Sequence, residues 1–363
     1  MSVPIVKAVR APRPFAKDLR ARSIGAKLLR AAGAPGMRPR RIFVALALFA
    51  AVSALGGAAQ LIAGRSGSAL APRSLLAHTP CDSFLAPGLL LGGLVGGSSA
   101  VAAILAWRRS RAAIDAAIVA GGALTVWIAA ELAMLREASW LHAVYGGLGV
   151  AMLGLAVRAA WRTRLPRHRW VIAVTAAEAA GYLAPALAGI LTARAGEPSA
   201  GALVAAGLVE GLALGAGQAW ALPFRVRRRR YALLTSLGAG AVWAGVMALM
   251  RLPGALPPAL ATVTGAAGGA LALAAIGAAQ WLELRHHAAR AWRWIAWTAL
   301  AWAIALPLSF APGPFVDEST PLASHVALWG AGGLLMAYAM ALVTWRGVRQ
   351  LAAERYVARH GGR

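Results

Sequence analysis

Apolar runs of about 20 residues, separated by short arginine-rich connections, constrain this chain more than any other feature. Residues 207–224 read GLVEGLALGAGQAWALPF and are followed by Arg225 and by arginines at 227–230. A helix needs about 20 apolar residues to cross the hydrocarbon core of a bilayer. The pattern therefore predicts an all-α fold, a polytopic transmembrane helix bundle of about ten spans. The expected spans are residues 42–63, 86–107, 112–135, 140–160, 170–193, 200–222, 231–252, 259–284, 292–312 and 322–345.

The composition supports a membrane protein and argues against a nucleic-acid partner. Only 13% of the residues are charged, whereas soluble domains average about 25%. The net charge of +25 would otherwise suggest nucleic-acid binding. Here the arginines lie in clusters between apolar runs, which is typical of loops that orient a membrane protein. We therefore predict the lipid bilayer as partner, with anionic lipid at the basic inner loops, and no nucleic acid.

The distribution of basic residues predicts the orientation. With both termini placed in the cytoplasm, five of the 37 Lys and Arg residues fall in outer connections, and the other 32 fall in the tails and inner connections. Positive residues are retained on the cytoplasmic side. We expect a multi-pass protein of the bacterial cytoplasmic (inner) membrane with cytoplasmic N- and C-termini. The outer basic residues are Arg65, Arg73, Arg136, Arg194 and Arg251.

Both ends of the chain are basic. Residues 1–41 are expected to form a disordered cytoplasmic tail, because their apolar side chains do not gather on one helical face. A targeting segment and a misassigned start are alternatives for the same stretch. Residues 346–363 are expected to form a second basic cytoplasmic tail. The single cysteine, Cys81, excludes an intrachain disulfide.

Residues 42–163 are predicted to form a four-span membrane module. Its second span opens with a glycine ladder at Gly88, Gly92 and Gly96. Helix backbones approach closely where side chains are absent, so this ladder predicts a helix-packing face.

Short motifs in this module resemble those of a group of bacterial polytopic membrane proteins. The matching residues are Thr79-Pro80, Phe84, Pro87-Gly88 and Trp127-Ile128 with Glu131, and Cys81 stands where an aromatic residue is expected. The resemblance covers about 110 residues. No activity is attached to that group, so the resemblance implies a membrane fold and no function.

Residues 164–345 are predicted to form a six-span module of repeated helical hairpins. Span starts at Arg169-Trp170, Arg230-Tyr231 and Arg293-Trp294 recur at intervals of 61 and 63 residues. Gln218 and Gln280 end the returning helices, 62 residues apart. This pattern resembles bacterial membrane proteins with repeats of the form Gly-x-x-x-Gly…Gln-Trp…Leu-Arg, which likewise carry no function that transfers. The predicted packing glycines of this module are Gly207, Gly211, Gly215, Gly265 and Gly269.

Ionisable residues within spans are costly, by about 2.5–3.5 kcal/mol at the helix centre on insertion scales, and so point to function. Glu178 and Glu210 lie deep in consecutive spans, and we expect them to face one bundle interior at similar depth, as neutral acids or as a proton relay. Asp115 is expected to pair with Arg111 one turn away, and Glu131 lies near Arg136.

Gln218 and Gln280 project from glycine-rich helix faces. We expect them to form interhelical hydrogen bonds, with substrate contact as the alternative.

Signals for enzymatic chemistry are weak. His78, Cys81, His142 and His325 lie in or near outer loops and are remote candidates for a zinc site, but no paired spacing on one helix supports it. We find no nucleophile elbow, P-loop or dinucleotide fingerprint in a suitable context. Neither a cofactor nor an enzymatic activity is predicted.

Three functional hypotheses remain from the sequence. The first is a structural or accessory membrane component that packs through its glycine faces, which also allow a homo-oligomer. The second is a proton-coupled transporter of a small solute or ion that uses Glu178 and Glu210. The third, a remote one, is an outer-face metalloenzyme.

Overall fold

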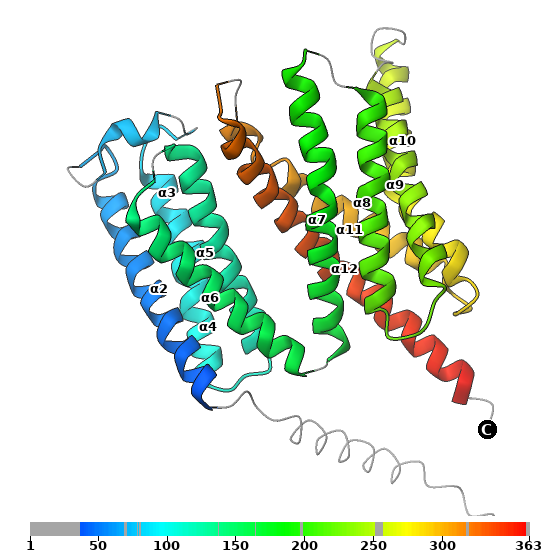
Figure 1. Ribbon diagram of the computed structural model, residues 1–363, viewed down its shortest axis with the longest axis horizontal. Helices are drawn as coiled ribbons and strands as arrows, with labels where there is room; N and C mark the ends of the chain where they lie inside the picture. Colours follow the sequence, from blue (N-terminus) through cyan, green and yellow to red (C-terminus); the bar gives the residue numbers. More distant parts are fainter. Residues whose placement is uncertain are drawn as a thin grey trace, which may run out of the picture.

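The chain folds as a bundle of long helices. The computed structural model describes residues 37–68, 71–77, 79, 81–136, 138–163, 165–196, 199–250, 257–316 and 319–360. Within this part, no strand occurs and ten helical stretches are long and apolar enough to cross a membrane. The predicted all-α bundle is therefore confirmed. The first described helix begins, and the last helix ends, at the same end of the bundle (Figure 1). We call this the terminal end. The predictions for residues 1–36 lie outside the described residues.

The first module consists of four antiparallel spans. They are α2 (Met37–Ala63), a second span of three consecutive pieces, α5 (Ala113–Leu135) and α6 (Trp140–Thr163). The second span runs through α3 (Leu85–Leu90), the π-helical turn η2 (Leu91–Gly97) and α4 (Ser98–Trp107). A 3₁₀ turn, η1 (Arg73–Leu76), lies in the preceding connection.

The glycine ladder of the second span faces α2. A Cβ added to Gly88 would lie 2.8 Å from a side-chain carbon of Ile62, and one at Gly96 would lie 3.0 Å from the Leu55 side chain. At Gly92 the corresponding neighbour is Ala58, at 3.0 Å. The two helices therefore touch at a distance that larger residues would not permit.

The second module is a closed ring of helices. Its members are α7 (Pro166–Arg194), α8 (Ala200–Ala221), α9 (Arg228–Met250), α10 (Pro258–Leu284), α11 (Arg293–Ser309) and α12 (Leu322–His360), with the short turn η3 (Gly313–Phe315) before α12. Each helix packs against the next one in the sequence, and α12 returns to α7. The interior of the ring is therefore lined by side chains from several helices.

Buried residues fall into two apolar clusters, one for each module. The first lies within α2–α6 and the second within the ring and its connections at the terminal end. The modules touch through α5 against α12 and α6 against α7. Large apolar side chains are also exposed on many helices, among them Val52, Leu237 and Leu271, as expected where helices face lipid.

The last helix is much longer than the expected span. The last apolar run was expected to end at residue 345, but α12 continues to His360. Val348 and Leu351 of this extension are buried, and Glu354 accepts a hydrogen bond from the Arg290 amide at 3.0 Å. The extension is therefore held by contacts that hydropathy does not reveal.

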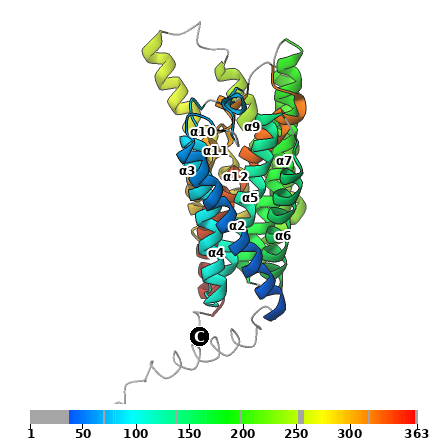
Figure 2. The same ribbon diagram turned by 90° about the vertical axis from the view of Figure 1, so that its left-hand side faces the viewer.

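The first half of α10 stands apart. None of its described side chains between residues 259 and 271 is buried, and Figure 2 shows this end of α10 leaning away from the other helices at the top of the view. A Cβ at Gly265 or Gly269 would meet no described atom within 4 Å. These two glycines therefore make no close helix contact here, unlike the other predicted packing glycines.

Candidate functional site

A cavity of about 740 Å³ lies inside the helix ring. All six helices of the ring contribute to its walls. The lining begins at Glu178 near the middle of α7 and reaches Ala193, Met250 and Phe310 at the end opposite the termini. Its volume falls in the range of about 300–1,000 Å³ that holds small-molecule ligands.

The cavity walls are apolar and rich in aromatic side chains. Trp243, Trp302, Trp329 and Phe310 contribute rings, and α9 and α12 add methionines. Among the residues that the structure describes, the lining includes no Lys or Arg. Large rings and flexible thioethers suit an apolar or aromatic ligand of variable shape.

Glu178 lies at the deep end of the cavity and is fully buried. Its carboxyl oxygens accept no hydrogen bond from any other donor in the described part of the chain, and their polar neighbour is the Glu210 carboxyl, which lies within hydrogen-bond reach. Two buried carboxyls at this distance can pair only if at least one of them carries a proton. A carboxyl pair at the floor of a cavity therefore marks a place where a proton or a ligand can bind.

Glu210 faces the same cavity from α8. Its backbone approaches α7 closely, because a Cβ at Gly181 would lie 3.0 Å from the Glu210 Cα. The indole nitrogen of Trp243 donates a hydrogen bond to the Glu210 carboxyl at 3.0 Å. The Trp243 ring lies over Gly207, where any side chain would collide with it. The glycine at 207 thus makes room for the indole that holds Glu210.

Two further polar side chains extend this site. Tyr182 lies one helical turn after Glu178, and its ring packs on Gly333 of α12. The indole nitrogen of Trp302 on α11 is buried and has no hydrogen-bond partner in the described chain. The cavity floor therefore offers one free donor beside the carboxyl pair.

A buried polar layer closes the ring one turn below the cavity floor. Gln280 donates to the Gln218 carbonyl at 2.7 Å and to the Thr235 hydroxyl at 3.1 Å. Tyr231 donates to Gln218 at 3.1 Å, and Trp294 donates to Gln280 at 2.6 Å. We call these five residues the polar layer; all are at most 2% exposed.

The three hairpins of the ring make equivalent contacts at this level. The aromatic residue that begins each odd-numbered helix donates to the returning helix of the preceding hairpin. Tyr231 reaches Gln218 on α8, and Trp294 reaches Gln280 on α10. Trp170 closes the circle by donating to the Thr344 hydroxyl on α12 at 3.2 Å. The repeat itself stays a prediction, but these contacts place its aromatic residues in matching positions.

The polar layer separates the cavity from the terminal end. Leu214, Ile276 and Met336 line the cavity, and the residues four positions further along, Gln218, Gln280 and Met340, are buried. Four residues correspond to about 6 Å along a helix. The cavity is therefore accessible from one side of the bundle and closed on the other.

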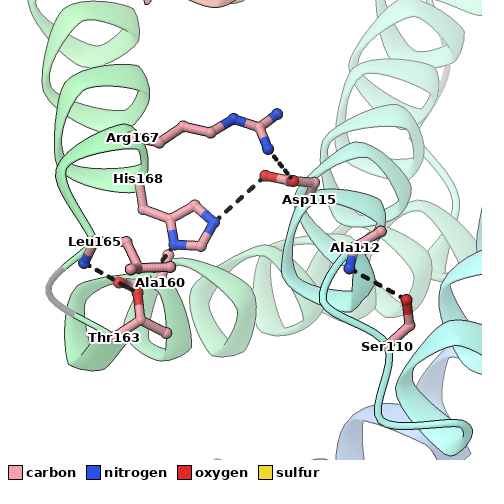
Figure 3. A network of polar contacts seen from close by, with 8 residues as sticks. All are labelled: Ser110, Ala112, Asp115, Ala160, Thr163, Leu165, Arg167 and His168. Atoms are coloured by element: carbon pink, nitrogen blue, oxygen red, sulfur yellow. Dashed lines mark hydrogen bonds and ion pairs between the residues drawn. The ribbon is translucent and has the colours of Figure 1, made fainter. Parts of the chain in front are cut away.

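A second polar network joins the two modules at the terminal end (Figure 3). The Asp115 carboxylate of α5 pairs with Arg167 at 2.7 Å and with His168 at 3.5 Å, both from α7. The His168 ring is fixed from its other nitrogen by Thr163 at 3.0 Å. The sequence suggested Arg111 as the partner of Asp115, and the observed partners instead come from the other module.

The other intramembrane carboxylate with a predicted role is peripheral. Glu131 lies 4.0 Å from His142 in the first module, outside the cavity. Its side chain is 30% exposed. Glu131 therefore has a local partner and is not part of the candidate site.

The remote candidates for a zinc site do not come together among the residues that the structure describes. His78 lies outside the described residues. Cys81 is partly exposed, His142 contacts Glu131, and His325 lies at the cavity mouth. Among the residues that the structure describes, no group of three or more His, Cys, Asp or Glu is placed to hold a metal ion.

The sequence indicated part of this site. Depth led us to expect that Glu178 and Glu210 face one interior, and spacing led us to expect interhelical hydrogen bonds from Gln218 and Gln280. That the two glutamines bond to each other was not predicted. Tyr182 could have been found because it follows Glu178 by four residues, on the same helical face. Trp243 and Trp302 carry no comparable signal, since their role depends on which neighbours the ring brings to them.

Comparison with family models, curated proteins and solved structures gives no match for this chain.

Proposed function

We propose that this chain is a proton-coupled transporter of a small solute or ion in the bacterial inner membrane, with Glu178 and Glu210 as its proton-carrying residues. One observation carries the proposal: a ligand-sized cavity ends at a buried carboxyl whose polar neighbour in the described chain is a second carboxyl. A purely structural bundle gains nothing from such an arrangement, because burying two neighbouring carboxyls costs free energy.

Closure on one side supports transport. A transporter exposes its binding site to the two sides of the membrane in turn, and sites near the bilayer midplane within repeated hairpins are typical of transporters. The cavity reaches one end of the ring, and the polar layer closes the other. The charge distribution favours a cytoplasmic terminal end, so we assign this conformation as open to the outside.

The carboxyl pair supports proton coupling. A neutral pair is compatible with the apolar cavity when no cation is present, and a bound cation would favour the charged form. Proton release and substrate binding are then linked at one place. The polar layer would have to rearrange for the site to open toward the cytoplasm.

Reconstitution into liposomes tests this function. A pH gradient should drive solute flux, or solute should drive proton flux, for the wild-type protein. Glu178→Gln and Glu210→Gln should abolish the coupled flux and remain folded. Glu131→Gln is the matched control, because it removes an intramembrane carboxyl outside the cavity. Coupled flux that survives in both cavity variants would contradict the proposal.

The structural or accessory role is the second candidate. The close contacts that Gly88, Gly211 and Gly215 make with neighbouring helices of the same chain favour it. This role makes no use of the cavity, so it predicts that Glu178→Gln leaves both behaviour in the membrane and partner binding unchanged. Contact between the inner arginines and anionic lipid is compatible with either role.

A further inference from the structure

We propose that the cavity binds a lipophilic, monovalent organic cation. When this cation binds, the Glu178–Glu210 pair releases one proton. This inference rests on the proposed function, because it names the substrate class of the same site. It is argued from the charge, the size and the wall chemistry of the cavity.

The charge of the ligand follows from the missing counter-ion. Among the described residues, the titratable ones that line the cavity are Glu178 and Tyr182 from α7, Glu210 from α8 and His325 from α12, and the described parts of α9, α10 and α11 contribute none. Arg194 lies near the mouth but does not line it, since it donates to the Thr320 carbonyl at 2.7 Å and lies 3.5 Å from His325. A charged carboxyl at the floor therefore has no cationic partner among the lining residues, and the ligand itself supplies the positive charge.

The valence follows from the carboxyl pair. Two neighbouring carboxylates in an apolar site repel, so one of them stays protonated. Glu210 already accepts the Trp243 N–H, whereas in the described chain the Glu178 oxygens accept from no donor other than the Glu210 carboxyl. Glu178 is thus the group left for direct contact with the ligand. A pair that carries one negative charge matches one positive charge.

The wall chemistry selects an organic cation over a metal ion. Hard inorganic cations need six or more oxygen ligands, and no suitable group of side chains occurs among the described residues. Aromatic rings attract organic cations through their faces, and the effect grows when water is excluded. Trp243, Trp302 and Trp329 supply such rings around a space of about 740 Å³.

The exchange step balances in charge and atoms. In the free protein both carboxyls are protonated and the site is neutral. When the cation enters, one O–H bond of the pair breaks, the proton passes to water, and the remaining carboxylate neutralises the cation. One cation is therefore exchanged for one proton, and the site stays electrically neutral.

Binding calorimetry on the purified full-length protein tests the inference directly. Tetraphenylphosphonium is the probe, because it is aromatic, permanently charged and has no proton of its own. Titrations in buffers of different ionisation enthalpy should report release of about one proton per bound probe. Triphenylphosphine oxide, a neutral analogue, should bind at least about tenfold more weakly, which corresponds to about 1.4 kcal/mol.

Variants separate the cation site from a general apolar pocket. Glu178→Gln should weaken tetraphenylphosphonium binding at least about tenfold and abolish proton release, whereas Glu131→Gln should change neither. Thermal unfolding of each variant in detergent shows whether it is folded, and Glu178→Asp serves as a second variant if Glu178→Gln is not. Equal binding of the charged and neutral probes without proton release would overturn the inference.

The outcomes distinguish this inference from the proposed function. If the protein binds the cation with proton release but shows no flux in liposomes, the cation site is supported and the transport function is contradicted. A pH-driven flux of another solute, without cation binding, keeps transport and removes this substrate class.

Discussion

At the scale of single residues, glycine sets where helices meet and where a side chain is admitted. Gly207 leaves space for the Trp243 ring, and Trp243 in turn holds Glu210. Gly181 lets α7 approach the backbone of Glu210 so closely that an added Cβ would lie 3.0 Å from the Glu210 Cα. Two glycines thus determine the geometry of one carboxyl, although neither carries any chemistry itself.

The contrast between Gly215 and Gly265 gives a prediction about stability. A Cβ at Gly215 would lie 2.7 Å from the Ala232 Cα, whereas one at Gly265 meets no described atom within 4 Å. Gly215→Ala should lower the free energy of unfolding by about 1–3 kcal/mol, because a backbone contact cannot easily give way. Gly265→Ala should leave it unchanged or raise it by up to about 1 kcal/mol. Unfolding in mixed detergent measures both, and equal effects would contradict the assigned contacts.

At the scale of elements, the ring depends on hydrogen bonds between helices that are far apart in the sequence. Gln280 of α10 contacts α8, α9 and α11 through Gln218, Thr235 and Trp294. A polar residue that joins four helices fixes their rotation about their own axes as well as their spacing. Closure of the cavity floor therefore depends on the hydrogen bonds that the polar layer makes between helices.

Replacement of Gln280 by an apolar residue tests this role. Gln280→Leu should lower the free energy of unfolding by about 1–3 kcal/mol, because the Trp294 N–H and the Gln218 carbonyl lose a partner in a buried site. The double variant Gln280→Leu with Trp294→Phe should be less destabilised than the sum of the single variants, since both partners are then absent. Strict additivity in the unfolding measurements would argue against the bond between Trp294 and Gln280.

At the scale of the whole molecule, the two modules are joined at the terminal end by the Asp115 network (Figure 3). The Asp115 side chain is 27% exposed and that of Arg167 is 44% exposed, so solvent screens their attraction. Pairs of this kind contribute up to about 1 kcal/mol. The network therefore orients the modules more than it stabilises them.

Hydrogen exchange can detect that orienting role. Asp115→Asn should speed amide exchange at the start of α7, where Arg167 and His168 lose their partner, and should shift global unfolding by less than about 1 kcal/mol. Arg111→Gln is the control, since Arg111 was expected from the sequence to be the partner. Equal effects of both variants on α7 exchange would show that Arg111 contributes as much as the cross-module pair.

The orientation of the whole molecule can be tested with its single cysteine. Cys81 is partly exposed and lies in the connection between α2 and α3, at the end of α2 that is opposite the terminal end. In bacterial cells that express the protein, an impermeant maleimide should label Cys81 from outside the inner membrane. Arg225→Cys in a Cys81→Ser background should be labelled only after the membrane is opened, because Arg225 lies in a predicted cytoplasmic connection. The reverse pattern of labelling would invert the assigned topology.

The sequence by itself determined the number of spans and their approximate ends. Span length and apolar composition are local properties, because every backbone group in lipid must be satisfied within its own helix. The expected span 86–107 appears as Leu85–Trp107, and 200–222 as Ala200–Ala221. Local information also sufficed to single out Glu178 and Glu210, since a carboxyl within an apolar run is visible without a structure.

Only the tertiary structure decided what those carboxyls face. The cavity exists because six helices close into a ring, and its walls combine side chains that are far apart in the sequence, such as Glu178 and Met336. The same holds for Arg167 as the partner of Asp115 and for the helical extension of α12 beyond residue 345. In lipid, apolar faces do not distinguish one neighbour from another by hydrophobicity, so the choice of partner depends on close packing and on individual hydrogen bonds. Close packing and hydrogen bonds are properties of pairs of helices, and the hydropathy of a single helix does not predict them.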